Sequence, residues 1–194
     1  FRRMQIDRFA LYLALLAVKA EADKVDTAID VLVNGDGNSG TTPTNHNLTA
    51  LDTAAIAPFL TLKALLAWKM KWANPYNCNL VLAQEADALQ VLLLNVGSAN
   101  TPFATFAGSF GIGGVTPINS GLGPMQLGWT SAAPTLKLVG VDSRFALEMI
   151  TEVGSNRTET DKIISNQQNE IVITETVGFA VFDAAANKTL DINA

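Results

Sequence analysis

Residues 144–192 read RFALEMITEVGSNRTETDKIISNQQNEIVITETVGFAVFDAAANKTLDI. Two β-rich runs, 145–153 and 171–182, flank a polar middle, and a short third run closes the stretch at 190–192. Apolar side chains alternate with Thr and Glu in the second run, which predicts strands with one buried face and one face that is exposed to solvent or packed against another surface. Val, Ile, Thr and Phe favour such a pleated surface. The stretch carries no His, Cys or spaced acid pair, so we predict that it holds a sheet and performs no chemistry.

A single long helix is predicted ahead of this stretch, over residues 2–33. Its apolar residues recur at spacings of three and four, as an amphipathic helix requires; they are Ile6, Phe9, Leu13, Leu16, Ala20, Val25, Ala28, Ile29 and Leu32. Neither Gly nor Pro interrupts it, and Asn34-Gly35 supplies the left-handed cap that ends helices. About 30 residues at 1.5 Å each give a rod of roughly 45 Å. Such a rod spans a domain or forms its backbone; the alternative is an ordinary bundle helix.

The middle of the chain is predicted to alternate loops with short helices and strands. Residues 35–47 form a loop by composition. Thr49 with Asp52 resembles a capping box for a helix, or helix pair, that reaches about residue 72, and Pro58 inside it either starts a second segment or makes a kink. A turn at 74–77 precedes a buried strand, 80–82. The helix 84–94 follows, with Leu89, Leu92 and Leu93 facing inward and Gly97 at its end. This strand and helix form a small α/β unit.

Two further segments complete the expected order. A long loop rich in Gly, Pro, Ser and Thr covers 98–134, and loops of this length are usually functional or involved in contacts. The next strand is 136–141. The polar connection 156–169, with Glu159, Asp161 and Lys162, is either an exposed link or paired across a subunit boundary.

Motifs for catalysis, metals and nucleotides are weak in this sequence. His46 is the only histidine and Cys78 the only cysteine, so no His–Ser, Cys–His or metal cluster is indicated. Asp36 is the only carboxylate in its glycine-rich loop, whereas calcium needs several oxygen ligands. The glycines at 111–114 and 121–123 lack the Lys and Ser or Thr of a P-loop and do not open a helix. We therefore expect no enzyme, no cofactor and no metal, and no catalytic, cofactor-binding or metal-binding residue.

Charge and hydropathy narrow the classes of partner. The net charge is -5, which gives no basic face for nucleic acid. Lys63, Lys69 and Lys71 with Trp68 and Trp72 could form a basic aromatic surface, but lysines on the wet side and tryptophans in the core fit the pattern better. The run 11–18 is far shorter than a membrane span of roughly 20 residues. With 48% hydrophobic and 16% charged residues, the apolar surplus is expected to be buried, and burial between subunits is one way.

The order of these elements resembles the major capsid proteins of tailed bacteriophages. The ending, 171–183 (IVITETVGFAVFD) with Ala184–Ala186 and 190–192, is similar to the C-terminal part of that family, which has the Hong Kong ninety-seven type fold also found in encapsulin nanocompartments. The resemblance implies an α+β fold in three segments. Residues 1–45 would be the spine helix of the peripheral domain, 46–142 the axial domain, and 143–194 the return to the peripheral sheet and C-terminal strands.

Self-assembly is what this resemblance implies for function. Copies would form pentamers and hexamers that close into an icosahedral shell around double-stranded DNA, in a virion assembled in the bacterial host cytoplasm. Scaffolding, portal and decoration proteins are possible partners, DNA would be contacted only non-specifically, and no membrane is involved. The alternatives are an encapsulin-like shell with protein cargo, and a soluble α/β enzyme or ligand-binding domain that uses the 98–134 loop.

Two features of the family have no counterpart here, an N-terminal arm and an extended loop ahead of the spine helix. Phe1-Arg2-Arg3 would be the end of that loop, in a chain that is proteolysed, truncated or disordered before it. The family's crosslink between a loop Lys and an Asn of a neighbour therefore transfers to no residue. Without arm and loop, we expect these residues alone to form a monomer or small oligomer in dilute solution.

Overall fold

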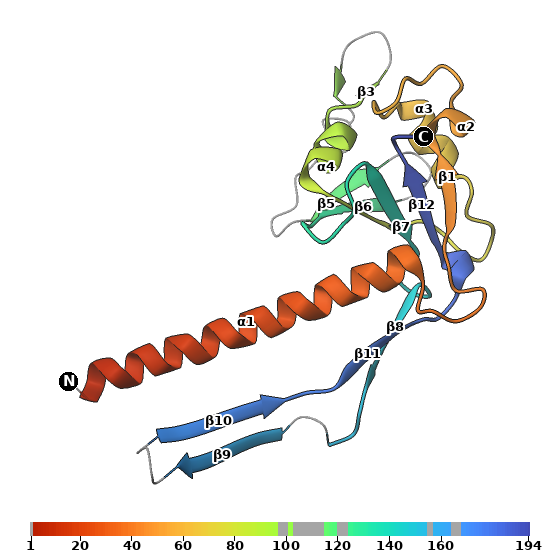
Figure 1. Cartoon of the computed structure of the whole chain (residues 1–194). Helices are drawn as coiled ribbons and strands as arrows, with labels where there is room; N and C mark the ends of the chain where they lie inside the picture. The colour runs from red at the N-terminus through yellow and green to blue at the C-terminus, as the bar shows by residue number, and fades with distance from the viewer. Residues whose placement is uncertain (1, 97–100, 103–114, 120–123, 155–156, 164–167) are drawn as a thin grey trace.

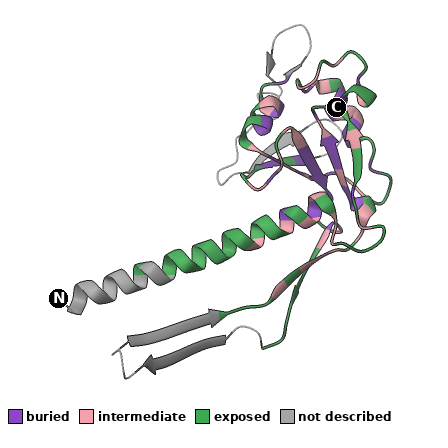
Figure 2. Ribbon diagram, viewed as in Figure 1, coloured by how far each residue is buried: buried purple, intermediate pink, exposed green. Residues whose placement is uncertain are grey.

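The protein is described by a computed structural model that covers residues 2–96, 101–102, 115–119, 124–154, 157–163 and 168–194. A domain built on a six-stranded sheet lies at one end, and a long helix and a two-stranded ribbon extend from it side by side (Figure 1). Buried residues are concentrated in the domain, while the described part of the helix is exposed over most of its length (Figure 2). The α+β class predicted from the sequence is confirmed.

The predicted rod is confirmed as α1 (Arg2–Asn34), which has 33 residues and a length of about 50 Å. It ends as expected at Gly35, whose φ of +84° suits glycine and whose N–H donates to the Val31 carbonyl at 2.9 Å. Among the described residues of α1, only Ile29 and Leu32 are buried, and both lie where the helix meets the domain. α1 is therefore not an ordinary bundle helix.

The domain sheet has the strand order β1-β12-β7-β2-β6-β5. β1 pairs parallel with β12 and β2 parallel with β6, and the other neighbours pair antiparallel. The strands are β1 (Thr44–Asn47), β2 (Leu80–Ala83), β5 (Val115–Asn119), β6 (Pro124–Trp129), β7 (Lys137–Val141) and β12 (Asn187–Asp191). The predicted strands at 80–82, 136–141 and 190–192 are confirmed as β2, β7 and β12.

Two predicted loops were wrong in part, because they contain strands of this sheet. β1 lies inside 35–47, and β5 and β6 lie inside 98–134, where β4 (Thr101–Pro102) also pairs with β3 (Asn95–Val96). β1 is wholly polar (TNHN), and β5 and β6 contain proline, so their sequences favour turns over strands. Tertiary pairing decides their structure instead. Gly97 and the glycines at 111–114 and 121–123 lie outside the described residues.

Helices α3 (Leu62–Lys69) and α4 (Glu85–Leu92) pack on one face of the sheet, in one continuous core. Trp68 is fully buried and Trp72 nearly so, with ring centroids 5.3 Å apart in an edge-to-face arrangement. Val139 and Val141 point to the opposite face, where they pack with Leu32 of α1. One strand thus contributes to both cores and joins α1 to the domain.

The details of the predicted helix pair need correction. α2 (Leu48–Leu51) has only four residues, its N-cap is Asn47 instead of Thr49, and Asp52 follows as the C-cap. The Asp52 carboxylate instead accepts from the Thr61 hydroxyl at 2.8 Å and from Lys63 at 3.0 Å. Thr61 caps α3, so the second helix begins at Leu62, four residues after Pro58. The local capping signal was overridden by a contact nine residues downstream.

The inward face predicted for the helix at 84–94 was also wrong. α4 buries Asp87, Ala88 and Val91, whereas Leu89 and Leu93 are exposed and Leu92 is half-buried. The helix is shorter than predicted and contacts β2 and β6 at one end of the domain, so only a narrow face is covered. Its larger apolar side chains are left on the surface.

The ribbon consists of two successive antiparallel pairs. β8 (Leu147–Thr151) pairs with β11 (Val177–Val181), and β9 (Arg157–Ile163) pairs with β10 (Gln168–Thr174). The two predicted runs are confirmed as strands, but the polar connection 156–169 was wrong, since most of it forms β9 and the start of β10. Backbone pairing places Asp161 opposite Glu170 and Lys162 opposite Asn169. The closing strand β12 joins the domain sheet rather than the ribbon, and the limits of the three predicted segments stay a prediction.

Candidate functional site: the joint and the exposed apolar surfaces

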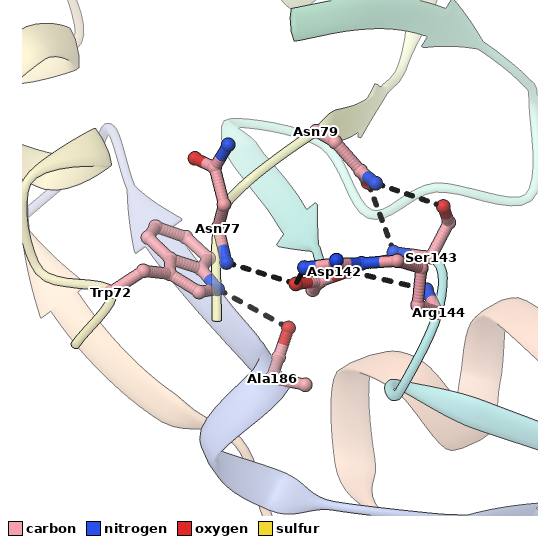
Figure 3. Close-up of polar contacts among 7 residues, drawn as sticks. All are labelled: Trp72, Asn77, Asn79, Asp142, Ser143, Arg144 and Ala186. Atoms are coloured by element: carbon pink, nitrogen blue, oxygen red, sulfur yellow. Dashed lines mark hydrogen bonds and ion pairs between the residues drawn. The ribbon is translucent and has the colours of Figure 1, made fainter. Parts of the chain in front are cut away.

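The turn that leaves the domain sheet for the ribbon is fixed by a buried carboxylate (Figure 3). Asp142 follows β7 directly and is fully buried. The Arg144 guanidinium donates to both of its oxygens, at 2.9 and 2.7 Å, and the Asn77 N–H donates at 2.9 Å. These donors, Arg144 above all, hold the pKa of Asp142 at about 2. The carboxylate is therefore charged near neutral pH, and the turn is held by ionic hydrogen bonds.

Two further contacts hold the same turn against the domain. The Asn79 amide donates to Ser143 Oγ at 3.0 Å, and the Ser143 N–H returns a bond to Asn79 Oδ1 at 2.9 Å. The Ala186 carbonyl accepts from the Asp142 N–H at 2.8 Å and from Trp72 Nε1 at 3.2 Å (Figure 3). We call the contacts that connect the domain, the ribbon and the end of α1 the joint, which comprises Asp36, Trp72, Tyr76, Asn77, Asn79, Asp142, Ser143, Arg144, Phe145, Asp183, Ala186 and Asn187.

The end of α1 is attached to the joint by two polar contacts. The Asn187 side chain donates to the Leu32 carbonyl, and Asp36 Oδ2 accepts from the Val181 N–H at 3.1 Å. The Thr41 hydroxyl and the Asn38 N–H stabilise the charged Asp36, which lowers its pKa to about 2. Asp36 thus connects the loop that follows α1 to β11. No group of three metal-ligating side chains occurs among the described residues.

Aromatic side chains complete the joint on the ribbon side. The Tyr76 hydroxyl donates to Asp183 Oδ2, and the Asp183 N–H donates to the Phe145 carbonyl at 3.0 Å. The Phe145 ring lies 5.7 Å from Tyr76 edge-to-face and stacks on Phe182 at 6.4 Å. The hydrogen bond between the Tyr76 hydroxyl and Asp183 lowers the pKa of Asp183 and raises that of Tyr76. The helix, the ribbon and the domain are therefore connected by specific bonds.

Further along, α1 lies against β11, and an ion pair bridges it to the connection between β10 and β11. Lys24 Nζ is 2.6 Å from Glu175 and 2.9 Å from Glu21, and both bonds raise the pKa of Lys24. A groove of about 350 Å³ beside the pair is lined by Ala20, Thr27, Val177 and Phe179 among others. Because Lys24 and Glu175 are partly exposed, this pair adds little stability.

Beyond the joint, large apolar side chains face solvent on both α1 and the ribbon, which we call the two arms. Leu11, Leu15, Leu16, Val18 and Val25 are exposed on α1, Met149 and Ile150 are exposed on β8, and Val153 is exposed just after β8. A soluble monomer rarely leaves so much apolar surface uncovered. The ribbon strands also have unpaired edges, which favour contact with further chains. Among the described residues, α1 and the ribbon therefore combine exposed apolar side chains with open strand edges.

The residues singled out in the sequence for reactivity or nucleic-acid binding lie in separate places among the described residues. Cys78 is fully buried, and burial raises the pKa of its thiol to about 12, so it is a poor nucleophile. His46 lies in β1 instead of the predicted loop, and burial lowers its pKa. Trp68 and Trp72 are buried as predicted, which removes the aromatic half of a nucleic-acid surface. Lys69 is also buried, so the prediction of solvated lysines was wrong at that position.

None of the joint residues was identified from the sequence. Asp142 offered the only signal, because a carboxylate directly after a buried strand must find donors. Its donors lie in a different segment, with Asn77 65 positions away. Among the described residues, no helix is long and apolar enough to cross a membrane.

This architecture, a long helix beside an antiparallel ribbon, both attached to a mixed α/β domain, is the Hong Kong ninety-seven type fold, which solved capsid and virus-like particle structures share. Sequence comparisons alone find nothing, since no family model and no curated protein matches the chain.

Three solved structures carry the assignment of the fold. The chain is similar to the capsid of an empty GTA particle with a TM-score of 0.64 and 14% identity over 95% of this chain and 66% of that one. A virus-like particle from Pyrococcus furiosus matches with a TM-score of 0.52 and 10% identity over 87% and 62%. The capsid of Myoviridae phage XM1 matches with 0.50 and 12% over 92% and 64%. The chain therefore spans just under two thirds of the length of each of these proteins.

Proposed function

We propose that this chain is a structural subunit, the major capsid protein of a phage head, that assembles with its own copies into a closed icosahedral shell around double-stranded DNA. The observation that carries the proposal is the exposed apolar surface of α1 and β8, which the domain does not cover. Identical neighbours are the simplest cover, since many modest contacts between copies close a shell. The fold shared with capsid subunits supports the same proposal.

The rigid joint fits this role, because a shell needs arms of fixed direction. Contacts between copies close at a defined size only if each subunit holds its interfaces at constant angles. The bonds of Asp142, Asn187 and Tyr76 provide that constancy for the ribbon and α1. We further propose that the chain has no catalytic role, is found in the virion after assembly in the bacterial cytoplasm, and meets scaffolding, portal or decoration proteins there.

The second candidate is an encapsulin-like compartment with protein cargo, favoured by the similarity to the virus-like particle from Pyrococcus furiosus. A third candidate, an enzyme or ligand-binding domain using 98–134, has less support, since part of that segment forms β5 and β6.

Electron microscopy of the product of the complete gene tests these alternatives. The proposal predicts closed shells whose contents are digested by nuclease after opening. Shells that contain only protein would favour the compartment. A product that forms no shells, at any concentration that keeps it soluble, would overturn both and leave the third candidate.

A further inference from the structure

A groove runs between α4 and the end of β6, at the side of the domain away from the ribbon (Figure 1). It has a volume of about 450 Å³ and is lined by residues 84–86, Leu89 and residues 129–131. A second hollow of about 230 Å³ continues along α4 and shares Glu85, Leu89 and Trp129 with the first. The two hollows therefore form one surface, which we call the α4 groove.

Backbone pairing holds both walls of the α4 groove in place. Ala83 ends β2, lies opposite Trp129 in the sheet and accepts a hydrogen bond from the Thr130 N–H at 3.0 Å. α4 begins two residues after Ala83, at Glu85, so its first turn lies beside the end of β6. Ligand sites are usually formed before the ligand arrives, and this groove meets that condition.

The wall from β6 presents an exposed tryptophan. Trp68 and Trp72 are buried in the core, whereas Trp129 is 42% exposed and lines both parts of the groove. Its indole offers a flat apolar face with an N–H donor at the edge. Within the described part of the chain, Trp129 Nε1 makes no hydrogen bond. The ring is therefore available both for stacking and for donating a hydrogen bond.

Polar side chains without partners among the described residues surround this ring. They are Gln84, Glu85 and Ser131, which we call the polar rim. Gln84 is the N-cap of α4 but makes no capping hydrogen bond. The polar rim offers donors from the amide and the hydroxyl, and acceptors from the carboxylate, the amide and the hydroxyl. An apolar floor with a few free polar groups is typical of a small-molecule site.

The charge of the groove narrows the class of ligand. Glu85 is the charged residue of the lining, and residues 72–136 contain no lysine or arginine. A phosphate or an acidic sugar would therefore meet a carboxylate and no cation. An organic cation would pair with Glu85 but offers no acceptor, so the donors of Gln84 and Trp129 would stay unpaired. A neutral sugar suits both kinds of group, because each of its hydroxyls donates and accepts.

We infer that the α4 groove binds a neutral sugar, whose ring stacks on the Trp129 indole while its hydroxyls bond to the polar rim. One face of a sugar ring consists largely of C–H groups, and stacking removes that face and the indole from water. Binding at one open groove is weak, but a shell would repeat the groove in every copy and so bind a polysaccharide through many sites at once. The inference goes beyond the proposed function and does not depend on it.

An NMR titration of the nitrogen-labelled chain tests the inference, because the three tryptophans give three separate indole N–H signals. Trp68 and Trp72 are buried and serve as internal references, and Trp129→Phe identifies the signal of Trp129. The sugar probes are cellobiose, maltose, lactose and chitobiose. Sorbitol is the control, since this open-chain polyol has the hydroxyls of a sugar but no fixed C–H face. Choline represents organic cations, and adenosine monophosphate represents anions.

The expected result is a saturable shift of the Trp129 signal with at least one of the four sugars, while the two reference signals stay fixed and sorbitol has no effect. Trp129→Ala should abolish the sugar-induced shift of the Ala86 amide signal. Glu85→Gln, on the exposed surface of α4, should weaken binding several-fold without affecting the fold, because it removes the charged acceptor. Met70→Ala is the matched control, since Met70 is equally an exposed apolar residue but lies outside the groove, and it should bind as the wild type does.

Three results would overturn the inference. The four sugars could leave the Trp129 signal unchanged up to the limit of their solubility. Choline or adenosine monophosphate could shift it at lower concentrations than any sugar, which would assign the groove to a charged ligand. Sorbitol could shift it as strongly as the sugars do, which would show that no ring stacks on the indole. Shell formation by the complete gene product is observed separately, so the failure of either claim leaves the other standing.

Discussion

Gly140 of β7 lies directly beneath the tryptophan pair, and replacing it by alanine tests the packing of the domain core. A Cβ at this position would lie 2.7 Å from the Trp68 ring, 2.7 Å from the Trp72 ring and 2.9 Å from a second Trp68 atom. Trp68 is fully buried and Trp72 donates to the Ala186 carbonyl, so neither ring can turn away freely. The added methyl group must therefore displace rings that are held on all sides.

Overpacking of this kind costs about 1–3 kcal/mol of unfolding free energy. For a chain of this size, each kcal/mol lowers the midpoint of thermal unfolding by about 2–4 °C, so Gly140→Ala should unfold about 2–12 °C below the wild type. Urea titrations followed by tryptophan fluorescence measure the free energy, and the two rings report their own displacement.

Gly178 of β11 provides the matched control. A Cβ there meets nothing closer than the Ile150 carbonyl at 4.0 Å, so Gly178→Ala should remain within about 0.5 kcal/mol of the wild type. Adding Trp72→Phe to Gly140→Ala should make the two changes non-additive by about 0.5–3 kcal/mol, because the smaller ring relieves the clash. Gly140→Ala with wild-type stability would refute the described packing of Trp68 and Trp72.

Three other perturbations have defined outcomes. The pKa of Asp142 is about 2 in the folded chain, below that of a free carboxyl, so its contribution to the unfolding free energy is present above pH 4 and is lost as the pH falls toward 2. Asp142→Asn should remove roughly 2 kcal/mol of this loss in urea titrations between pH 2 and 5. An unchanged pH profile would contradict the role of the joint. Cys78 should react with a thiol reagent only when the chain unfolds, and rapid labelling under native conditions would show that the core is open. Lys24→Ala should lower the unfolding free energy by less than about 1 kcal/mol, and a larger loss would mean that its bridge to Glu175 holds α1 in place.

The sequence predicted those elements whose local signals agree with their tertiary setting. α1 was predictable because 32 residues contain no Gly or Pro and end in Asn34-Gly35. The strands at 80–82 and 136–141 were predictable because a buried central strand must be apolar, and β2 and β7 lie side by side in the middle of the sheet.

The elements that were wrong have polar sequences or narrow interfaces. β9 reads RTETDKI, which has no apolar face, and it forms because β10 pairs with it along seven residues. The face of α4 was wrong because β2 and β6 cover only a narrow side of it, a fact of tertiary packing that helical periodicity does not contain.

The joint was beyond sequence analysis for a different reason. Its bonds connect residues that are far apart in the chain, with 107 positions between Tyr76 and Asp183 and 155 between Leu32 and Asn187. Each residue is an ordinary polar side chain in its own segment, and only the fold brings the partners together.

If the proposed function is right, other copies of the chain cover the exposed apolar residues of α1 and β8. Cryo-electron microscopy of particles formed by the complete gene product, at a resolution that traces side chains, can observe that cover. We expect closed shells in which Leu15 and Met149, both 60% exposed in the single chain, are buried against neighbouring copies. Shells in which these two residues face solvent, or a product that stays monomeric, would contradict it.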